Sequence, residues 1–334
     1  MAQRSPELLT DLLKQTSRSF YLTLLVLPAA VRPQIGLAYL LARATDTIAD
    51  TEIVSPELRL GALEKLRERI LGKNQGALNF GELAKHQGSG SEKVLLERAE
   101  EAIAVLAGFA VEDQKRIRDV LDTITSGQEL DLKRFSTANE KKIVALQTDA
   151  ELDDYTYRVA GCVGEFWTKM CVAHLFQHRK TDQDFLLTNG VRFGKGLQLV
   201  NILRDLPRDL RSGRCYIPEQ RLNSLGLIPD DLLSPSNEPK FRPLYQSYLN
   251  IAHEHLAAGW DYTNYLPKND FRLRLACAWP ILIGAKTLQK LRAENVLDPA
   301  RRVKIGRKDV RNIIVKSRLL YLFPAAWKAQ FTKF

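Results

Sequence analysis

The apolar residues of this chain follow a helical spacing, which limits the folds that it can adopt. In long segments, apolar side chains return every three or four residues, as they do along the buried face of an α-helix. The segments with this spacing are residues 92–108, 111–132, 150–178, 183–206, 239–265, 271–292 and 308–318. No segment combines period-two alternation with enrichment in β-branched residues, the pattern of a half-buried strand. The sequence therefore predicts an all-α protein.

The composition is typical of a soluble globular protein with a sizeable core. Of the 334 residues, 45% are hydrophobic and 26% are charged. Turn-forming residues gather at 73–76, 87–91 and 229–243, but none of these loops is long enough to require a domain boundary. We therefore expect residues 1–334 to form a single helical domain, with residues 301–334 as a basic C-terminal segment.

The net charge indicates which partners the chain can bind, and the cysteines indicate the cellular compartment. The formal net charge of +10 favours polyanions such as nucleic acid, phospholipid headgroups or diphosphates. No zinc finger or RNA-binding signature is present, so we expect no nucleic-acid partner. The four cysteines form no CxxC pair and lie mostly in apolar stretches, which indicates reduced thiols. We expect a cytoplasmic protein, with peripheral contact to an anionic membrane surface left open; the sequence does not predict the oligomeric state.

The first acidic motif is a pair of aspartates that follows an apolar run, residues 35–41. Asp46 and Asp50 are four residues apart, so both carboxylates project from one face of a helix. Two carboxylates at this spacing repel each other unless a cation neutralises them, as a hard divalent cation bound by oxygen would do. A solvated helix end is the alternative that this motif alone leaves open.

A second acidic motif lies further along the chain. Gln198, Asn201, Asp205 and Asp209 follow one another at spacings of three, four and four residues, which form one polar stripe on a continuous helix. The other face of this helix is strongly apolar. Pro207 lacks a backbone N–H, so we expect the helix to bend or end nearby and Asp209 to lie at the bent end.

Together, the two motifs predict two helices that present acidic faces across a cavity and hold Mg²⁺ between them. Mg²⁺ is commonly bound by a few carboxylates together with the phosphate oxygens of a substrate. Arg43, Arg204 and Arg214 are close in sequence to the acidic residues. The planar guanidinium group suits phosphate oxygens. These residues therefore predict a site for magnesium and a diphosphate.

The two acidic motifs belong to a series of five distinctive segments along the chain. They are Thr16-Ser17-Arg18-Ser19-Phe20, then Asp46-Thr47-Ile48-Ala49-Asp50, then Tyr155-Thr156-Tyr157-Arg158-Val159-Ala160-Gly161-Cys162-Val163-Gly164, then Gln198 to Asp209, and finally Arg214-Cys215-Tyr216-Ile217-Pro218. In this order they resemble the squalene/phytoene synthase family, from about residue 15 to about residue 312. Ala49 and Arg208 depart from the family pattern, which usually has an acid at these positions, so we expect weaker metal binding.

The resemblance implies the α-helical isoprenoid synthase fold, with helices around a central apolar cavity, and it implies roles for individual residues. The ligands of Mg²⁺, directly or through water, would be Asp46, Asp50, Asp205 and Asp209. The binding site for farnesyl diphosphate would include Arg18, Ser19, Phe20, Tyr39, Arg43, Gln198, Asn201, Arg204 and Arg214. Tyr155 matches the tyrosine that is proposed to assist proton removal.

The reaction that the resemblance implies is the head-to-head condensation of two farnesyl diphosphates to presqualene diphosphate. In the squalene synthases of the family, NADPH then reduces this intermediate to squalene. The basic segment around Lys304 and Arg307 resembles the part of those enzymes that is linked to NADPH binding. Ala276 stands where eukaryotic members carry an aromatic residue, and Trp279 is a neighbour that could contact a cation. The alternative is a synthase of presqualene diphosphate, dehydrosqualene or phytoene that uses no reductant.

Two other classes of protein would share part of this pattern. A non-catalytic basic scaffold on membranes or nucleic acid has no need of the intact aspartate pairs. A terpene cyclase would also use Mg²⁺ and a helical fold, but the segment from Tyr155 to Gly164 disfavours it. The histidine pairs His174/His178 and His253/His255 have spacings that can bind metal, but they lack a third ligand, so we expect them to be structural.

Overall fold

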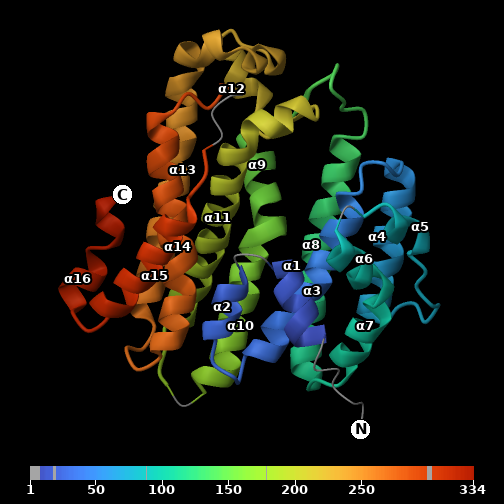
Figure 1. Cartoon of the computed structure of the whole chain (residues 1–334), viewed down its shortest axis with the longest axis vertical. Coiled ribbons are helices and arrows are strands. Elements are labelled where there is room, and N and C mark those ends of the chain that lie inside the picture. The colour runs from blue at the N-terminus through green and yellow to red at the C-terminus, as the bar shows by residue number, and fades with distance from the viewer. Residues whose placement is uncertain (1–7, 18–19, 88, 178, 299–302) are drawn as a thin grey trace. The chain divides into compact units, whose positions relative to one another are not determined.

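The computed structural model of the chain describes residues 8–17, 20–87, 89–177, 179–298 and 303–334 (Figure 1). Over these residues the chain is almost entirely helical, so the predicted all-α class is confirmed. Residue contacts group the chain into two compact units. Unit 1 holds Met1–Lys133 and Phe166–Thr181, and unit 2 holds Arg134–Glu165 and Asp182–Phe334. That the chain acts as a single domain stays a prediction.

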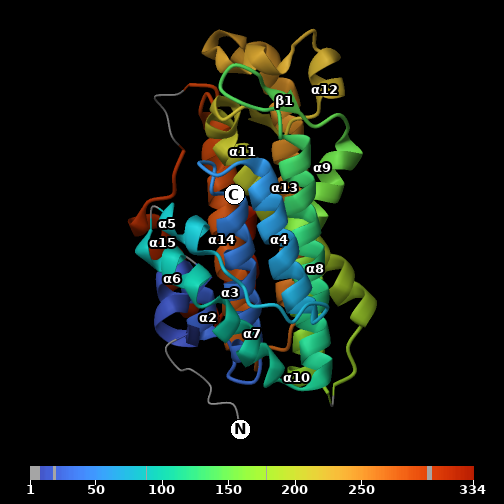
Figure 2. The same ribbon diagram turned by 90° about the vertical axis from the view of Figure 1, so that its right-hand side faces the viewer.

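Unit 1 is built around α3, which contacts α4, α6 and α7; Figure 2 shows α3 and α4 side by side. The hydroxyl of Ser55 caps α4 at its start, and Gly72, with φ +74°, ends it. The first helices of unit 1 are η1 (Leu8–Leu12, a π-helical turn), α1 (Leu13–Ser17), α2 (Phe20–Val26), α3 (Arg32–Ala49), α4 (Pro56–Leu71), α5 (Gly81–Lys85), α6 (Gly90–Glu97) and α7 (Ala99–Ala107). The long helix α8 (Val111–Arg134) follows them.

One segment of unit 1 differs from the prediction. The apolar pattern of residues 92–108 predicts one helix, but the structure divides it into α6 and α7 at Arg98, which has φ −104° and ψ 17°. Both short helices contact α3. The break at Arg98 therefore lets each of them bury its own apolar residues against the same helix.

Unit 2 contains the longest helices and a minimal parallel sheet. The strands β1 (Val144–Ala145) and β2 (Arg214–Cys215) pair with Val144 opposite Arg214. The helices are α9 (Asp149–Thr156), η2 (Tyr157–Gly161, π-helical), α10 (Cys162–Leu175, which continues into unit 1), α11 (Gln183–Arg211), α12 (Glu219–Asn223), η3 (Pro229–Leu233), η4 (Pro235–Asn237), α13 (Glu238–Tyr265), α14 (Phe271–Ala293), α15 (Arg307–Leu320), α16 (Pro324–Lys328) and η5 (Phe331–Lys333). The sequence predicts the long members of this set to within a few residues, apart from the C-terminal end of α11.

Unit 2 is organised by α11, which packs against α13 and against the η2 segment, while α13 packs on α14 and α14 on α15 (Figure 1). Two glycine contacts bring backbones together. A Cβ atom on Gly164 would lie 1.8 Å from the Gly190 carbonyl oxygen, and one on Gly194 would lie 2.1 Å from the Ala160 carbonyl oxygen. Only glycine permits this approach. The segment that carries Tyr155 is therefore held directly against α11.

The expectation that α11 bends or ends near Pro207 is wrong in one respect, because the helix continues through this residue to Arg211. Pro207 cannot donate a hydrogen bond to the Leu203 carbonyl, which precedes it by four residues. The hydroxyl of Tyr245 on α13 donates to that carbonyl instead, at 3.0 Å, and both residues are buried. This replacement satisfies the orphaned acceptor. The helix therefore runs past Pro207, and Asp209 lies in its last turn.

Two further expectations concern the cysteines and the membrane. Cys162, Cys171, Cys215 and Cys277 are all buried, and none of these four described residues is in a disulfide. In the part of the chain that the structure describes, no helix has the length and apolarity needed to cross a bilayer.

Candidate active site

In unit 1, the predicted metal ligands Asp46 and Asp50 stand at the C-terminal end of α3. Asp46 lies in its last turn, and Asp50 is the residue that caps it. Burial among protein atoms is the main cause that raises the pKa of Asp46 to about 6, and repulsion from the Asp50 carboxylate adds to it. Nevertheless 47% of the Asp46 side chain is exposed. A cation in solution can therefore reach this pair, and the repulsion between the carboxylates would favour its binding.

Arg43 lies one turn before Asp46 on the same face of α3. Its Nη1 atom is 3.8 Å from Asp46 Oδ2, and its Nη2 atom donates a short hydrogen bond to the Glu92 carboxylate. Although burial lowers the pKa of Arg43, these acidic partners outweigh burial and raise it. The guanidinium is thus held protonated beside the aspartate pair, where it can bind a phosphate oxygen.

A second neighbour of Asp46 comes from α8. The Nε2 atom of Gln128 donates a hydrogen bond to Asp46 Oδ1 at 2.5 Å. Gln128 is only 7% exposed, and its Oε1 atom is buried without a hydrogen-bond partner. The amide therefore fixes the orientation of the carboxylate from the protein side.

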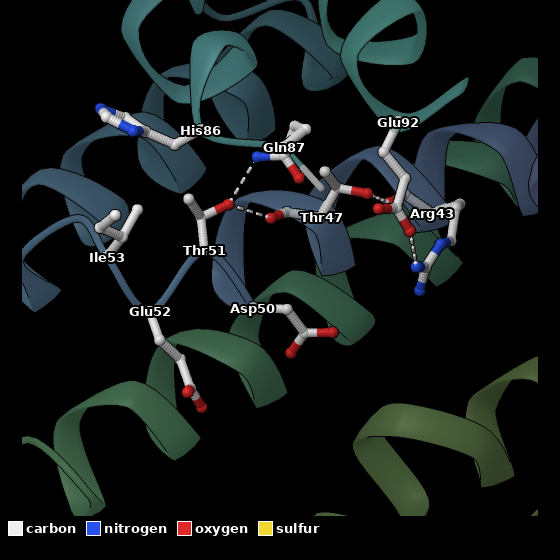
Figure 3. Close-up of a pocket in the computed structure, with 9 residues that line it drawn as sticks. All are labelled: Arg43, Thr47, Asp50, Thr51, Glu52, Ile53, His86, Gln87 and Glu92. Atoms are coloured by element: carbon white, nitrogen blue, oxygen red, sulfur yellow. Dashed lines mark hydrogen bonds and ion pairs between the residues drawn. The ribbon is translucent and has the colours of Figure 1, made fainter. Parts of the chain in front are cut away.

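A pocket of about 330 Å³ opens beside this end of α3 (Figure 3). Thr51 accepts a hydrogen bond from Gln87 and donates one to the Thr47 carbonyl, at 2.8 and 2.6 Å. The residues that line the pocket are Arg43, Thr47, Asp50, Thr51, Glu52, Ile53, His86, Gln87 and Glu92. Because nearly all of them are polar, the pocket suits a hydrated or phosphorylated group better than a prenyl chain. The central apolar cavity implied by the resemblance stays a prediction.

The early substrate-binding segment is described only in part. Arg18 and Ser19 lie outside the described residues. The ring of Phe20 stacks on that of Tyr39, with centroids 4.7 Å apart, and the Tyr39 hydroxyl lies 3.4 Å from the Thr16 carbonyl oxygen. The structure therefore brings the predicted pair Phe20 and Tyr39 together one turn before Arg43.

In unit 2, the predicted polar stripe lies along α11 as one continuous helical face. Asn201 and Gln198 are in contact, with the Asn201 amide nitrogen 3.4 Å from the Gln198 amide oxygen. Arg204 donates two hydrogen bonds to Asp205, with Nε at 2.9 Å and Nη2 at 2.5 Å from the carboxylate oxygens. Hydrogen bonding to Asp205 is the main cause that raises the pKa of Arg204, with a further contribution from Asp209. These charges are near enough to act as one site.

Tyr155, the predicted proton acceptor, belongs to a cluster of aromatic rings in unit 2. Its ring stacks on that of Tyr216 at 4.8 Å, and the two hydroxyl oxygens are 3.4 Å apart. Phe135 packs edge-on against Tyr216 at 5.3 Å. Tyr216 comes directly after β2, the strand that contains Arg214. The π-helical turn η2 begins two residues after Tyr155, and such turns are frequent at functional sites.

The predicted NADPH-binding residues are Arg307, the first residue of α15, and Lys304, three residues before it. Lys304 and Arg307 are both exposed. Asp309 in the first turn is paired with Lys290 of α14 at 3.2 Å. Trp279 is buried, and its indole N–H donates to the Ser317 hydroxyl of α15 at 2.9 Å. Its indole N–H thus points toward the helix of the basic segment.

The donor chemistry fits magnesium. Among the residues that the structure describes, no three His, Cys, Asp or Glu side chains gather closely enough to hold a metal by themselves. Mg²⁺ does not need such a cluster, because it usually keeps several waters and uses one or two carboxylates with substrate phosphates. The Asp46–Asp50 pair and the Asp205–Asp209 pair both offer such carboxylates.

Three neighbours of the site were not predicted from the sequence. Gln128 contacts Asp46 across 82 residues of chain, Glu92 contacts Arg43 across 49, and Tyr216 contacts Tyr155 across 61. Tyr216 lies in a segment on which the resemblance rests, but the resemblance does not predict its contact with Tyr155. Gln128 and Glu92 carry no local signal, because each is an ordinary polar residue on an amphipathic helix.

Comparisons with known proteins agree with the resemblance. The family model for squalene/phytoene synthase matches residues 13–309. The presqualene diphosphate synthase of Zymomonas mobilis is 30% identical over 293 residues, which are 86% of this chain and 84% of that protein. The squalene synthase of Saccharomyces cerevisiae is 27% identical over 233 residues, or 68% of this chain.

The chain spans less than two thirds of several other relatives. It covers 49% of the yeast protein, and 32% and 41% of the bifunctional lycopene cyclase/phytoene synthases of Blakeslea trispora and Colletotrichum graminicola. A solved TcSQS structure with the ligand E5700 superposes with a TM-score of 0.78 at 22% identity, covering 98% of this chain and 91% of that one. That similarity bears on the fold, which is the all-α fold of the isoprenoid synthases. By the extent of the family match, the chain belongs to the squalene/phytoene synthase family.

Proposed function

We propose that the chain is a magnesium-dependent prenyl transferase that joins two molecules of farnesyl diphosphate head to head into presqualene diphosphate. The observation that carries this proposal is the exposed carboxylate pair Asp46 and Asp50, whose mutual repulsion a cation would relieve, beside the protonated Arg43. A cation and a guanidinium in one place are what a diphosphate requires. The match of residues 13–309 to the family supports the same reaction.

The residues of the chain would act at the leaving group first. Arg43 in unit 1 and Arg204 in unit 2 are each suited to bind diphosphate oxygens, and acidic neighbours raise the pKa of each guanidinium. Asp46 and Asp50 in unit 1, and Asp205 and Asp209 in unit 2, would each hold Mg²⁺, which when bound would supply electrostatic stabilisation of the departing diphosphate. The allylic C–O bond breaks, and the diphosphate leaves with the electron pair. A preorganised positive site stabilises this developing charge.

The second step joins the two chains and releases a proton. The double bond of the second farnesyl diphosphate attacks the allylic cation, and loss of one proton closes the cyclopropane ring. Tyr155 would assist this proton removal, with its hydroxyl 3.4 Å from that of Tyr216. The phenol pair offers an oxygen acceptor and a neighbour to which the proton can be relayed.

A second candidate activity is the reduction of presqualene diphosphate to squalene by NADPH. Two observations favour it: Lys304 and Arg307 are exposed cations that a nucleotide phosphate can reach, and the yeast relative is a squalene synthase. The contrary alternative, release of presqualene diphosphate without reduction, is favoured by the Zymomonas relative, which this chain matches over 84% of its length. Of the two, we propose the reductive reaction as the complete activity.

The experiment that tests both is a product analysis. The purified protein is incubated with farnesyl diphosphate and Mg²⁺, with and without NADPH, and the products are identified by mass spectrometry after phosphatase treatment. Squalene formed only with NADPH supports the complete proposal. Presqualene alcohol under both conditions keeps the condensation and rejects the reduction. If farnesyl diphosphate and geranylgeranyl diphosphate both give no condensed product, the proposed function is wrong.

A further inference from the structure

The C-terminal end of α15 and the turn after it expose a cluster of large apolar side chains. We call Val315, Leu319, Leu322 and Phe323 the α15 patch; their exposed fractions are 46%, 64%, 79% and 61%. A single exposed leucine needs no explanation, but four such residues within nine positions are a concentration of exposed apolar side chains. Such a surface is typical of an interaction site.

The α15 patch is held outward by the opposite side of the same segment. Ser317 is buried and bonded to Trp279 of α14. The hydroxyl of Tyr321 donates to the Lys268 carbonyl at 2.6 Å, and its ring packs edge-on against Trp327 at 4.9 Å. Because these contacts fix the inner face of α15 and of the turn, the patch cannot be buried by a small rotation of the segment.

The charged residues nearest in sequence to the α15 patch are basic, and Asp309 in the first turn of α15 precedes them. Residues 310–334 contain five basic side chains and no acidic side chain. Lys316 and Arg318 are exposed and alternate with the patch residues along α15, and Lys328 is exposed on α16. The guanidinium carbon of Arg318 lies 5.4 Å from the Trp279 ring centroid, which holds this charge beside the patch.

A neighbouring turn extends the same character. Phe271, at the start of α14, is 50% exposed, and its ring lies 6.3 Å from that of Tyr321. The exposed side chains of Lys268 and Arg272 flank it, and Asp270 is the acidic residue between them. The apolar surface thus continues from α15 onto the start of α14, with basic side chains at its edge.

We propose that the α15 patch inserts into the headgroup region of an anionic phospholipid bilayer. Apolar side chains among lysines and arginines bind such a surface by burial and by attraction to acidic lipids. A protein partner is less favoured, because the cores of protein interfaces are depleted of lysine. This proposal depends on the exposed residues of the α15 patch and not on the proposed reaction.

The test is vesicle flotation of the 334-residue chain without substrate. Vesicles of phosphatidylcholine alone are compared with vesicles that also contain phosphatidylglycerol. The wild type floats with the anionic vesicles, and added salt weakens this binding. The double variant Leu322→Glu/Phe323→Glu weakens it at least about tenfold, because two apolar side chains no longer leave water. Lys316→Ala/Lys328→Ala weakens it about fivefold for each lysine.

A matched control separates the α15 patch from a general effect of added acids. Leu58→Glu/Val111→Glu alters two exposed apolar residues of unit 1, 66% and 75% exposed, and adds the same charge. This control floats like the wild type, and circular dichroism checks that every variant is folded. Absence of wild-type flotation, or equal loss in patch and control variants, overturns the proposal. A different outcome is that the wild type and the control are dimers, the patch variant is a monomer, and all three float equally. That result would overturn the proposal and assign the surface to a second copy of the chain.

Discussion

The hydroxyl of Tyr245 donates to the carbonyl of Leu203, the group that Pro207 leaves without its helical partner. We expect Tyr245→Phe to lower the free energy of unfolding by about 1–3 kcal/mol, because a buried carbonyl loses its donor. In a Pro207→Ala background the alanine N–H can bond to Leu203, so the same change should cost clearly less. Chemical denaturation of the four proteins of this cycle measures the difference. An equal loss in both backgrounds would show that the hydroxyl does not replace the missing N–H.

The metal assignment predicts that charge, rather than shape, matters at the two aspartate pairs. Asp46→Asn or Asp205→Asn should lower turnover at least about a hundredfold, because the diphosphate loses its stabilising charge. Circular dichroism should show the helical content retained. Asp119→Asn, which removes a surface carboxylate paired with Lys115, is the control and should leave turnover unchanged. Normal activity in both site variants would remove the basis of the magnesium site.

Gln128 should act as a positioning residue for Asp46. In Gln128→Met the side chain keeps its size but no longer donates to the carboxylate, so we expect a several-fold higher Mg²⁺ requirement. The free energy of unfolding should not fall, because the change also removes a buried amide oxygen that has no hydrogen-bond partner. Binding of Mn²⁺ with inorganic diphosphate, followed by electron paramagnetic resonance, measures the metal step apart from turnover. Unchanged metal binding would show that the amide is only part of the packing.

The buried carboxylate of Asp113 predicts a pH dependence of stability in unit 1. Burial alone would raise its pKa, but hydrogen bonds from His174, Gln34 and Arg116, at 2.9, 3.2 and 2.8 Å, outweigh burial and lower the pKa. A lowered folded-state pKa gives stability that is present above the unfolded value of about 4 and is lost as the pH falls below it.

Asp113→Asn should therefore reduce stability at neutral pH, and the difference from wild type should shrink in acid. Denaturation curves at several pH values measure this change. A difference that stays constant from neutral pH to pH of about 3 would contradict the role given to the ionised carboxylate.

If the basic segment binds NADPH, changes in it should weaken the reduction without affecting the condensation. In Lys304→Ala/Arg307→Ala we expect a higher apparent KM for NADPH, with the yield of presqualene diphosphate unchanged. Lys308→Ala/Arg311→Ala removes two exposed charges of the same helix and serves as the control. Unaltered reductant dependence in the first variant would exclude these two residues from cofactor binding.

The sequence predicts the helices well because their causes are local. The apolar spacing of residues 271–292 and 308–318 matches α14 and α15 closely, since every residue needed for the pattern lies within the segment. The end of α11 could not be predicted in this way. The carbonyl that Pro207 leaves without a donor is satisfied by Tyr245, which is 42 residues from Leu203 in the sequence and which no local pattern reveals.

The candidate site divides in the same manner. Asp46 and Asp50 share a face because of their spacing alone, so they could be predicted from the sequence. Gln128 meets Asp46 only because α8 packs near the end of α3, and this depends on the whole of unit 1. The resemblance supplied Tyr155, but the stacking of Tyr216 on its ring follows from the placement of β2 beside β1.

The approach of Gly164 to the Gly190 carbonyl has a consequence for anyone who wishes to redesign the enzyme. Even one methyl group at Gly164 must push the two backbones apart, because no side chain there could rotate away. Such a shift would carry Tyr155 and Asp205 along with their helices. A change made in the interest of chain-length selectivity would therefore displace two residues to which we assign proposed roles in proton removal and diphosphate binding. Mutant libraries that aim at new prenyl products should therefore keep this glycine contact invariant and vary the side chains around it.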